Sequence, residues 1–229
     1  MGPKLMIRNS DPEELAKRLR EDLLSCMADG DLLCIPTGRS PLELYQQIRE
    51  DSDSADRWRS FRYLQLDEYL DPSGSIHSFR DELSQQIFTP LQVPADQIHS
   101  IDPQGDPVTQ AKKLDQIYDR WGPPKACVLG LGSNGHIAFN EPGSSFSGYT
   151  VVDLAQETIA NNFPEPQPSK LQALTISLEQ IYASQHVFLL VPQPEKSSIL
   201  DRCLAGPKDV NIPASWLHDH PSLHVYRHR

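Results

Sequence analysis

Residues 32–41, Leu32-Leu33-Cys34-Ile35-Pro36-Thr37-Gly38-Arg39-Ser40-Pro41, decide the fold class. The four apolar residues that open this stretch predict a short buried strand, and Pro36 and Gly38 predict the turn that ends it. Ser40 followed by Pro41 is typical of a helix start, with Ser40 as the N-cap and Pro41 as the first helical residue. A strand that turns directly into a helix is the first half of a βαβ unit.

The same alternation extends on both sides of this stretch. Before it, Asp11-Pro12 predicts the start of a helix that ends at Gly30. After it, strands are expected at 61–66, 98–101, 126–131, 174–176, 186–191 and 223–226, and helices at 78–89, 107–120 and 194–205. Strands that alternate with helices predict an α/β fold, with βαβ units and a mostly parallel sheet.

Length and composition favour a single domain over residues 1–229 and exclude several classes of function. The net charge is −10 and no basic patch stands out, so we expect no nucleic-acid partner. No stretch approaches the roughly 20 apolar residues of a membrane span, and the first eleven residues lack the apolar core of a signal peptide. The four cysteines match no zinc spacing, which indicates buried thiols in a reducing, cytoplasmic compartment.

Polar segments follow three of the predicted strands: residues 37–40, 67–69 and 132–141. In open parallel sheets the ligand binds outside the carboxyl ends of the strands. We therefore expect these three segments to meet at one site.

The turn at Thr37-Gly38-Arg39-Ser40 has the features of an anion site. Free backbone N–H groups and the start of a helix favour a phosphate, and Arg39 and Ser40 add side-chain donors. Lys196 follows another strand-to-helix turn and becomes a phosphate partner if it lies near this one. An ordinary turn and a surface lysine remain the alternatives.

Two further segments carry titratable groups. Asp67, directly after strand 61–66, is the better candidate for a general base, while Glu68 is expected to face solvent or cap a turn. His136 and Glu141 form a possible proton shuttle, since a carboxylate can orient a His that titrates near neutral pH. A His satisfied by backbone bonds and two solvated acids remain open, and the spacing argues against a metal site.

Gly130-Leu131-Gly132-Ser133-Asn134-Gly135 matches the glycine pattern of dinucleotide-binding proteins, and Asp153 lies near the offset of a ribose-binding acid. That pattern requires a helix directly behind its third glycine. Asn140-Glu141-Pro142-Gly143 interrupts the chain too soon for one, which argues against a nucleotide cofactor.

Residues 131–143, Leu-Gly-Ser-Asn-Gly-His-Ile-Ala-Phe-Asn-Glu-Pro-Gly, resemble the signature of glucosamine-6-phosphate deaminases. Residues 36–41, 66–69 and 213–218 resemble further blocks of that family, in the same order. The resemblance implies a Rossmann-like doubly wound, mostly parallel sheet with helices on both faces. It also implies conversion of glucosamine 6-phosphate and water into fructose 6-phosphate and ammonia, without metal or organic cofactor.

By this resemblance Asp67 moves a proton between C2 and C1 of the sugar, and His136 assists ring opening. Glu141 and Asn134 then orient His136, although some members of the family have Asp in place of Asn134. The resemblance also places Asn162 where the family has a phosphate-contacting Arg, for which Arg39 is a candidate replacement.

A lid is expected over about residues 143–168. Three alternatives to the deaminase stay open: a 6-phosphogluconolactonase-like hydrolase, a non-catalytic sugar-phosphate-binding protein and, more distantly, a dehydrogenase. Oligomeric state and effectors do not follow from the sequence.

Overall fold

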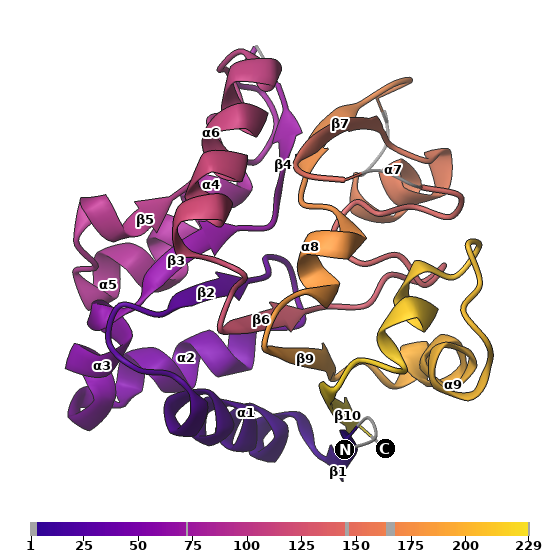
Figure 1. The fold of residues 1–229 in the computed structure, drawn as a ribbon. Helices are drawn as coiled ribbons and strands as arrows, with labels where there is room; N and C mark the ends of the chain where they lie inside the picture. The colour runs from indigo at the N-terminus through magenta and orange to yellow at the C-terminus, as the bar shows by residue number, and fades with distance from the viewer. Residues whose placement is uncertain (1–3, 72, 145–146, 164–167, 229) are drawn as a thin grey trace.

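The computed structural model describes residues 4–71, 73–144, 147–163 and 168–228. In them a seven-stranded sheet has the order β1-β10-β9-β6-β2-β3-β5, and every neighbouring pair is parallel (Figure 1). Its strands are β1 (Lys4–Ser10), β2 (Leu32–Ile35), β3 (Arg62–Gln65), β5 (Ile98–His99), β6 (Ala126–Leu129), β9 (His186–Val191) and β10 (Ser222–His228).

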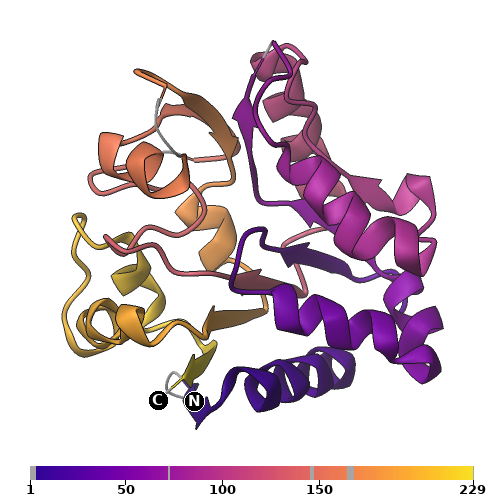
Figure 2. The same ribbon diagram turned by 180° about the vertical axis from the view of Figure 1, so that it is seen from behind.

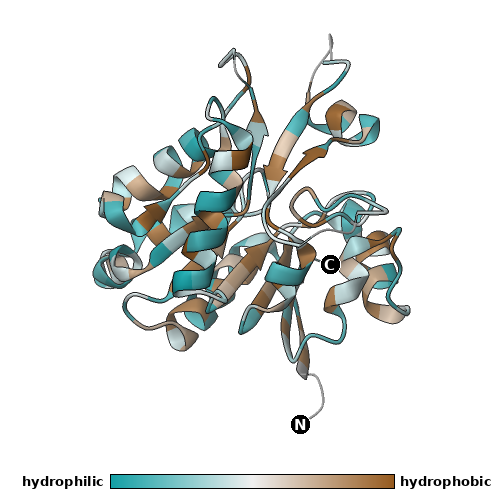
Figure 3. Ribbon diagram, turned by 45° about the horizontal axis from the view of Figure 1, so that its top comes forward, coloured by the Kyte–Doolittle hydropathy of each residue, from teal (hydrophilic) through white to brown (hydrophobic). Residues whose placement is uncertain are grey.

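Helices cover both faces of this sheet. One face packs against α1 (Pro12–Cys26), α2 (Leu42–Glu50) and α3 (Ala55–Ser60), and the other against α6 (Pro107–Trp121), α8 (Leu178–Tyr182) and α9 (Ser197–Ala205). Alternate residues of β2 supply the two cores, with Leu33 on the α1 side, where α1 and α2 lie side by side (Figure 2), and Cys34 on the opposite side. The hydrophobic colouring in Figure 3 accordingly concentrates on the central strands. The predicted doubly wound α/β fold is confirmed.

A second sheet stands beside the first. It is antiparallel, with the order β4-β8-β7, and consists of β4 (Asp67–Leu70), β7 (Thr150–Asp153) and β8 (Gln172–Thr175). The sequence predicted one strand at 61–66 with Asp67 just after it, whereas β3 ends at Gln65 and Asp67 is the first residue of β4. The chain passes from one sheet to the other at Leu66, because Ile176 donates its N–H to the Leu66 carbonyl and extends the pairing with the second sheet.

Other elements differ in their bounds from the prediction. Strand β1 was not expected; it lies at the sheet edge and pairs only with β10, among the described strands. The helix predicted at 78–89 consists of α4 (Phe79–Leu83), a π-helical turn (Ser84–Phe88) and α5 (Thr89–Leu91). The remaining helix is α7 (Gln156–Asn162), and 3-10 turns lie at Ser52–Ser54, Ala95–Gln97, Pro194–Lys196 and Pro213–Leu217. In the described part of the chain, no helix is long and apolar enough to cross a membrane.

The strand order reverses between β2 and β6, which are neighbours at the middle of the sheet. From β2 the chain continues to β3 and β5 on one side, and from β6 to β9 and β10 on the other. At such a switch point the loops leave in opposite directions and open a crevice at the carboxyl ends of the strands.

Candidate active site

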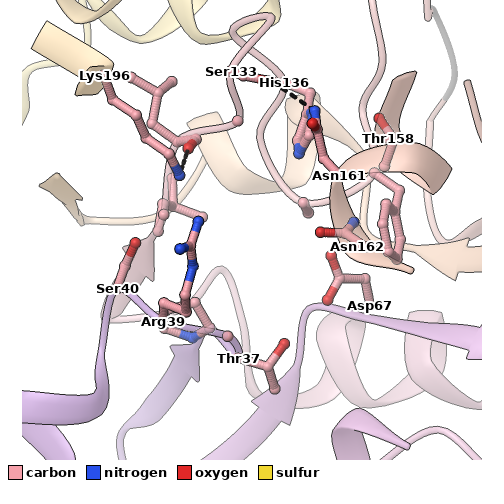
Figure 4. Close-up of a pocket in the computed structure, with 18 of the residues that line it drawn as sticks. Thr37, Arg39, Ser40, Asp67, Ser133, His136, Thr158, Asn161, Asn162 and Lys196 are labelled. Carbon is pink, nitrogen blue, oxygen red and sulfur yellow. Dashed lines mark hydrogen bonds between the residues drawn. The ribbon is translucent and has the colours of Figure 1, made fainter. Parts of the chain in front are cut away.

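A cavity of about 650 Å³ opens at this switch point (Figure 4). It brings together most of the residues that the sequence singled out, from the ends of β2, β3, β6 and β9. The predicted residues on its wall are Thr37, Gly38, Arg39, Ser40, Asp67, His136 and Lys196. The three expected segments therefore meet, while Asn134 and Glu141 contact the wall through His136.

One end of the cavity is cationic. Arg39 and Lys196 point toward one another there, with Ser40 beside them (Figure 4). The Lys196 ammonium donates to the Leu131 carbonyl (2.6 Å), and its burial and the nearby Arg39 charge lower its pKa. Lys196 is thus a half-buried pocket residue, and the surface alternative is wrong.

Two details of the predicted anion turn are wrong. Ser40 is not the N-cap of α2: the N-cap is Pro41, without a side-chain cap, and the Ser40 hydroxyl donates to Gln193 Oε1 (3.2 Å). The Gly38 N–H is not free either, because it donates to Glu82 Oε1 (2.7 Å). Both partners lie far away in the sequence. The charged side chains of Arg39 and Lys196 are therefore the donors that remain at this end of the cavity.

Asp67 lies at the other end of the cavity, beside Asn162 (Figure 4). Burial of its carboxyl group, with the charges of Glu68 and Glu82 nearby, raises its pKa to about 8. A carboxylate that binds a proton this strongly is suited to act as a general base near neutral pH.

Glu68, the neighbour of Asp67, is buried and does not face solvent. Its carboxylate accepts the backbone N–H groups of Phe79 (2.9 Å) and Arg80 (2.7 Å) and the Ser78 hydroxyl (2.9 Å). It therefore caps the N-terminus of α4, as one of the two sequence alternatives stated.

His136 is held by a chain of polar side chains. Asn134 Oδ1 accepts from both the backbone N–H and the ring Nδ1 of His136 (3.0 and 2.8 Å). The Asn134 amide donates to Glu141 Oε2 (3.0 Å), and the Thr158 hydroxyl donates to the other oxygen of Glu141. Since Asn134 Oδ1 can only accept, Nδ1 carries the proton and Nε2 is the basic nitrogen.

The protonation of His136 follows from its surroundings. Burial lowers its pKa, the Lys196 charge acts in the same direction, and Glu141 opposes both. Glu141 Oε2 lies 3.7 Å from Nδ1, so the ring is oriented by side chains rather than satisfied by backbone bonds. A neutral ring with a basic Nε2 at the cavity wall can accept a proton from a hydroxyl group.

Two glycines of residues 130–135 are required by the local packing, one of them against the His136 ring. A Cβ at Gly132 would lie 2.3 Å from the His136 ring. Gly135 has φ +86°, and a Cβ there would be too close to the Ile212 side chain. No helix follows in residues 136–144 or 147–149, and Asp153 is exposed and bonded to Gln172. The dinucleotide interpretation is therefore excluded by the local structure.

Some pocket residues were missed by sequence reasoning. Ser198 and Arg202 of α9 line the cavity next to Lys196, and α7 contributes Thr158 and Asn161. Ser198 and Arg202 are four residues apart and therefore lie on one face of the helix. With Lys196 already assigned to the site, this spacing could have identified both residues as part of it. Among the described residues, no group of three or more His, Cys, Asp or Glu side chains is arranged to hold a metal ion.

Fold and site together define the class: a doubly wound α/β protein whose pocket at the switch point pairs a cationic end with a carboxylate and an oriented histidine. Residues 10–225 match the family model described as "Glucosamine-6-phosphate isomerases/6-phosphogluconolactonase", and the chain belongs to this family.

Its relatives include glucosamine-6-phosphate deaminases, and a 6-phosphogluconolactonase has the same fold. A glucosamine-6-phosphate deaminase of Geobacillus sp. (strain WCH70) is 31% identical over 96% of this chain and 91% of its own length. Glucosamine-6-phosphate deaminase 2 of Bacillus subtilis is 33% identical over 85% and 82%. The structure of a monomeric glucosamine-6-phosphate deaminase superposes with a TM-score of 0.88 at 26% identity, covering 98% of this chain and 97% of that one. A 6-phosphogluconolactonase of Thermotoga maritima shares the fold, with a TM-score of 0.79 at 19% identity and coverage of 99% and 100%.

Proposed function

We propose that this protein converts glucosamine 6-phosphate and water into fructose 6-phosphate and ammonia. One observation carries the proposal: a carboxylate and a histidine with a basic Nε2 face the cavity whose opposite end is cationic. A phosphorylated sugar placed along this cavity presents its phosphate to one end and its C1 and C2 atoms to the other.

The cationic end matches the charge of a phosphate monoester. Arg39, Lys196 and Arg202 bring three cationic side chains to the cavity wall, which also carries the carboxyl groups of Asp67 and Glu195. Such cationic side chains bind the charged oxygens of a phosphate. The family has a phosphate-contacting Arg where this chain has Asn162, and Asn162 lies beside Asp67 (Figure 4). Arg39 and Arg202 supply the positive charge in place of that Arg.

Ring opening falls to His136. Nε2 accepts the proton of the C1 hydroxyl, the bond between C1 and the ring oxygen breaks, and that oxygen takes up a proton as the open-chain aldehyde forms. Asn134 and Glu141 hold the ring in the required tautomer and stabilise the imidazolium that forms in between.

Isomerisation falls to Asp67. The carboxylate removes the proton from C2, and the electron pair of that C–H bond forms a C1–C2 double bond. The C1–O double bond opens at the same time onto its oxygen, which takes up a proton from water to give an enolamine. Return of a proton to C1 leaves an imine at C2, which water hydrolyses to the ketone with release of ammonia. The raised proton affinity of Asp67 suits this transfer, and the ammonium group of the substrate helps to keep the carboxylate ionised.

We also retain two narrower proposals. Residues 143–168 are proposed to act as a lid; Thr158, Asn161, Asn162 and Phe163 of this segment line the cavity, while 145–146 and 164–167 lie outside the described residues. A cytoplasmic location is supported by the four free cysteines.

The test is to incubate the purified protein with glucosamine 6-phosphate and to measure ammonia and fructose 6-phosphate together. We expect equal amounts of both products, with turnover lost in Asp67→Asn and kept in the matched variant Asp81→Asn, which changes an exposed acid of α4. Hydrolysis of 6-phosphogluconolactone instead would favour the lactonase alternative. Thermal stabilisation by sugar phosphates without turnover of either substrate would favour the binding protein.

A further inference from the structure

Helix α4 forms hydrogen bonds with segments from both ends of the cavity. Its N-terminus is capped by Glu68, the β4 residue next to Asp67. Near its C-terminal end, Glu82 reaches the turn at Gly38. The same short helix therefore contacts the strand that carries the proposed base and the turn that carries Arg39.

The Glu82 contacts are specific. One oxygen accepts the Gly38 N–H at 2.7 Å, and the other lies 3.0 Å from His77 Nε2, whose ring lines the cavity. The Glu82 side chain is 15% exposed. Gly38 has φ +80° and nothing lies within 4 Å of where a Cβ would lie, so no side chain packs against this position. The Tyr45 hydroxyl binds the Pro36 carbonyl and the Ser40 hydroxyl binds Gln193 on either side of it, and the Glu82 bond holds the Gly38 N–H between them.

We propose that Glu82 is a positioning residue of the site, and that Glu68 and Glu82 together make α4 a bracket that fixes the separation between Asp67 and the turn at residues 37–39. The inference deepens the proposed function, and rests on it, because a set separation matters only for a ligand that spans both ends of the cavity. A hexose 6-phosphate is such a ligand, since the chain of bonds from C2 to the phosphate sets a maximum distance between the two groups.

The chemistry of the contact between Glu82 and the Gly38 N–H supports a hydrogen bond that ties α4 to the turn, rather than a chance proximity of the two groups. Hydrogen bonds to a carboxylate are shorter and stronger than those between neutral groups. A displacement of about 1 Å between reacting groups can lower a rate by about a hundredfold. A charge-assisted bond at each end of α4 limits that displacement without placing either glutamate in contact with the substrate.

The test compares Glu82→Ala, which removes the tie, with Glu82→Gln, which keeps an acceptor for the Gly38 N–H. Asp81→Ala is the matched control, because it removes a neighbouring acid whose side chain is 59% exposed. Three quantities are measured: hydrogen exchange of the Gly38 amide by NMR, the Kd of fructose 6-phosphate and of inorganic phosphate by calorimetry, and kcat and KM for glucosamine 6-phosphate.

For Glu82→Ala we expect at least tenfold faster exchange at Gly38 and a Kd for fructose 6-phosphate raised about tenfold, corresponding to one lost hydrogen bond. The Kd of inorganic phosphate, which occupies one end only, should stay within about twofold, because the tie sets a separation rather than the phosphate contacts. Glu82→Gln should restore exchange and affinity to within about threefold, because a neutral acceptor keeps roughly half the strength of the bond.

Equal exchange at Gly38 in the unmodified protein and in Glu82→Ala would overturn the proposal. So would an equal loss of affinity for both ligands, or the same losses in Asp81→Ala. If the unmodified protein fails to turn over glucosamine 6-phosphate, that result counts against the proposed function alone, since the exchange and binding measurements still decide whether α4 is a bracket.

Discussion

Replacing Asp67 by Asn should abolish turnover and at the same time stabilise the fold, increasingly so as the pH rises. The pKa of Asp67 is about 8 in the folded protein, against about 3.9 in an unfolded chain. Between pH 4 and pH 8 the folded protein therefore keeps a proton that the unfolded chain loses. Asp67 stabilises the fold fully below pH 4, and this contribution is lost as the pH rises through 8.

The size of the effect follows from the same shift. Each pH unit between the two pKa values lowers the free energy of unfolding by about 1.4 kcal/mol, so a shift of about four units gives roughly 5–6 kcal/mol. The carboxyl group faces an open cavity, where water screens the charge, and we therefore expect about 2–4 kcal/mol at pH 8. Asn has no charge to bury at any pH and avoids this loss.

The assay is urea unfolding at pH 5, 6, 7 and 8 for the unmodified protein, Asp67→Asn and the exposed control Asp81→Asn. The stability gained by Asp67→Asn should grow with pH and level off above about pH 8, while Asp81→Asn gains none. Turnover by Asp67→Asn should fall by roughly 10²–10⁴, the contribution of a general base.

Two results would refute the reasoning. A stability difference that is independent of pH would mean that Asp67 ionises normally in the folded protein. A variant that is stabilised but keeps its turnover would mean that another group removes the proton from C2.

Two further predictions follow from the same site. The kcat/KM for glucosamine 6-phosphate should rise with pH up to about 8 as Asp67 ionises, whereas kcat should rise at lower pH, because the bound ammonium group favours the ionised carboxylate. Rate profiles from pH 5.5 to 9, corrected for titration of the substrate, test this difference. A rise of kcat and kcat/KM at the same pH would contradict it. Arg39→Ala and Arg202→Ala should each raise KM about tenfold and change kcat by less than about twofold, since each removes one phosphate contact made before and during the reaction. The control is Lys17→Ala, which removes one exposed charge of α1 outside the pocket. An unchanged KM in either arginine variant would exclude the replaced arginine from the phosphate site.

Much of the fold follows from local patterns. The apolar runs at residues 32–35, 126–129 and 187–191 are buried strands because continuous apolar residues are buried on both faces of a parallel sheet. Asp11 caps α1 as its side chain and the following Pro predict. Such signals act within a few residues, so the sequence shows them directly, and with them it shows which segments leave the carboxyl ends of the strands.

Most of the residues of the site could also be predicted from the sequence. Seven of the nine residues that the sequence singled out line one cavity, because parallel strands bring their carboxyl ends to one edge. Asn134 was expected to orient His136 only through the family resemblance, whereas Glu141 was also proposed from the residues as a carboxylate that orients a His. The structure shows the bonds that join the three side chains.

Only the tertiary structure decided the partners that are distant in sequence. The Gly38 N–H binds Glu82, 44 residues away, and the Ser40 hydroxyl binds Gln193, 153 residues away. Burial beside Glu68 and Glu82 raises the pKa of Asp67, and the packing of α9 brings Arg202 to the cavity wall. Hydrogen bonds, burial and charge depend on which segments meet in space, and a local sequence pattern contains no information on those meetings. The sequence by itself therefore determined the helices, the strands and the candidate groups, and the packing of the elements determined which group has which neighbour.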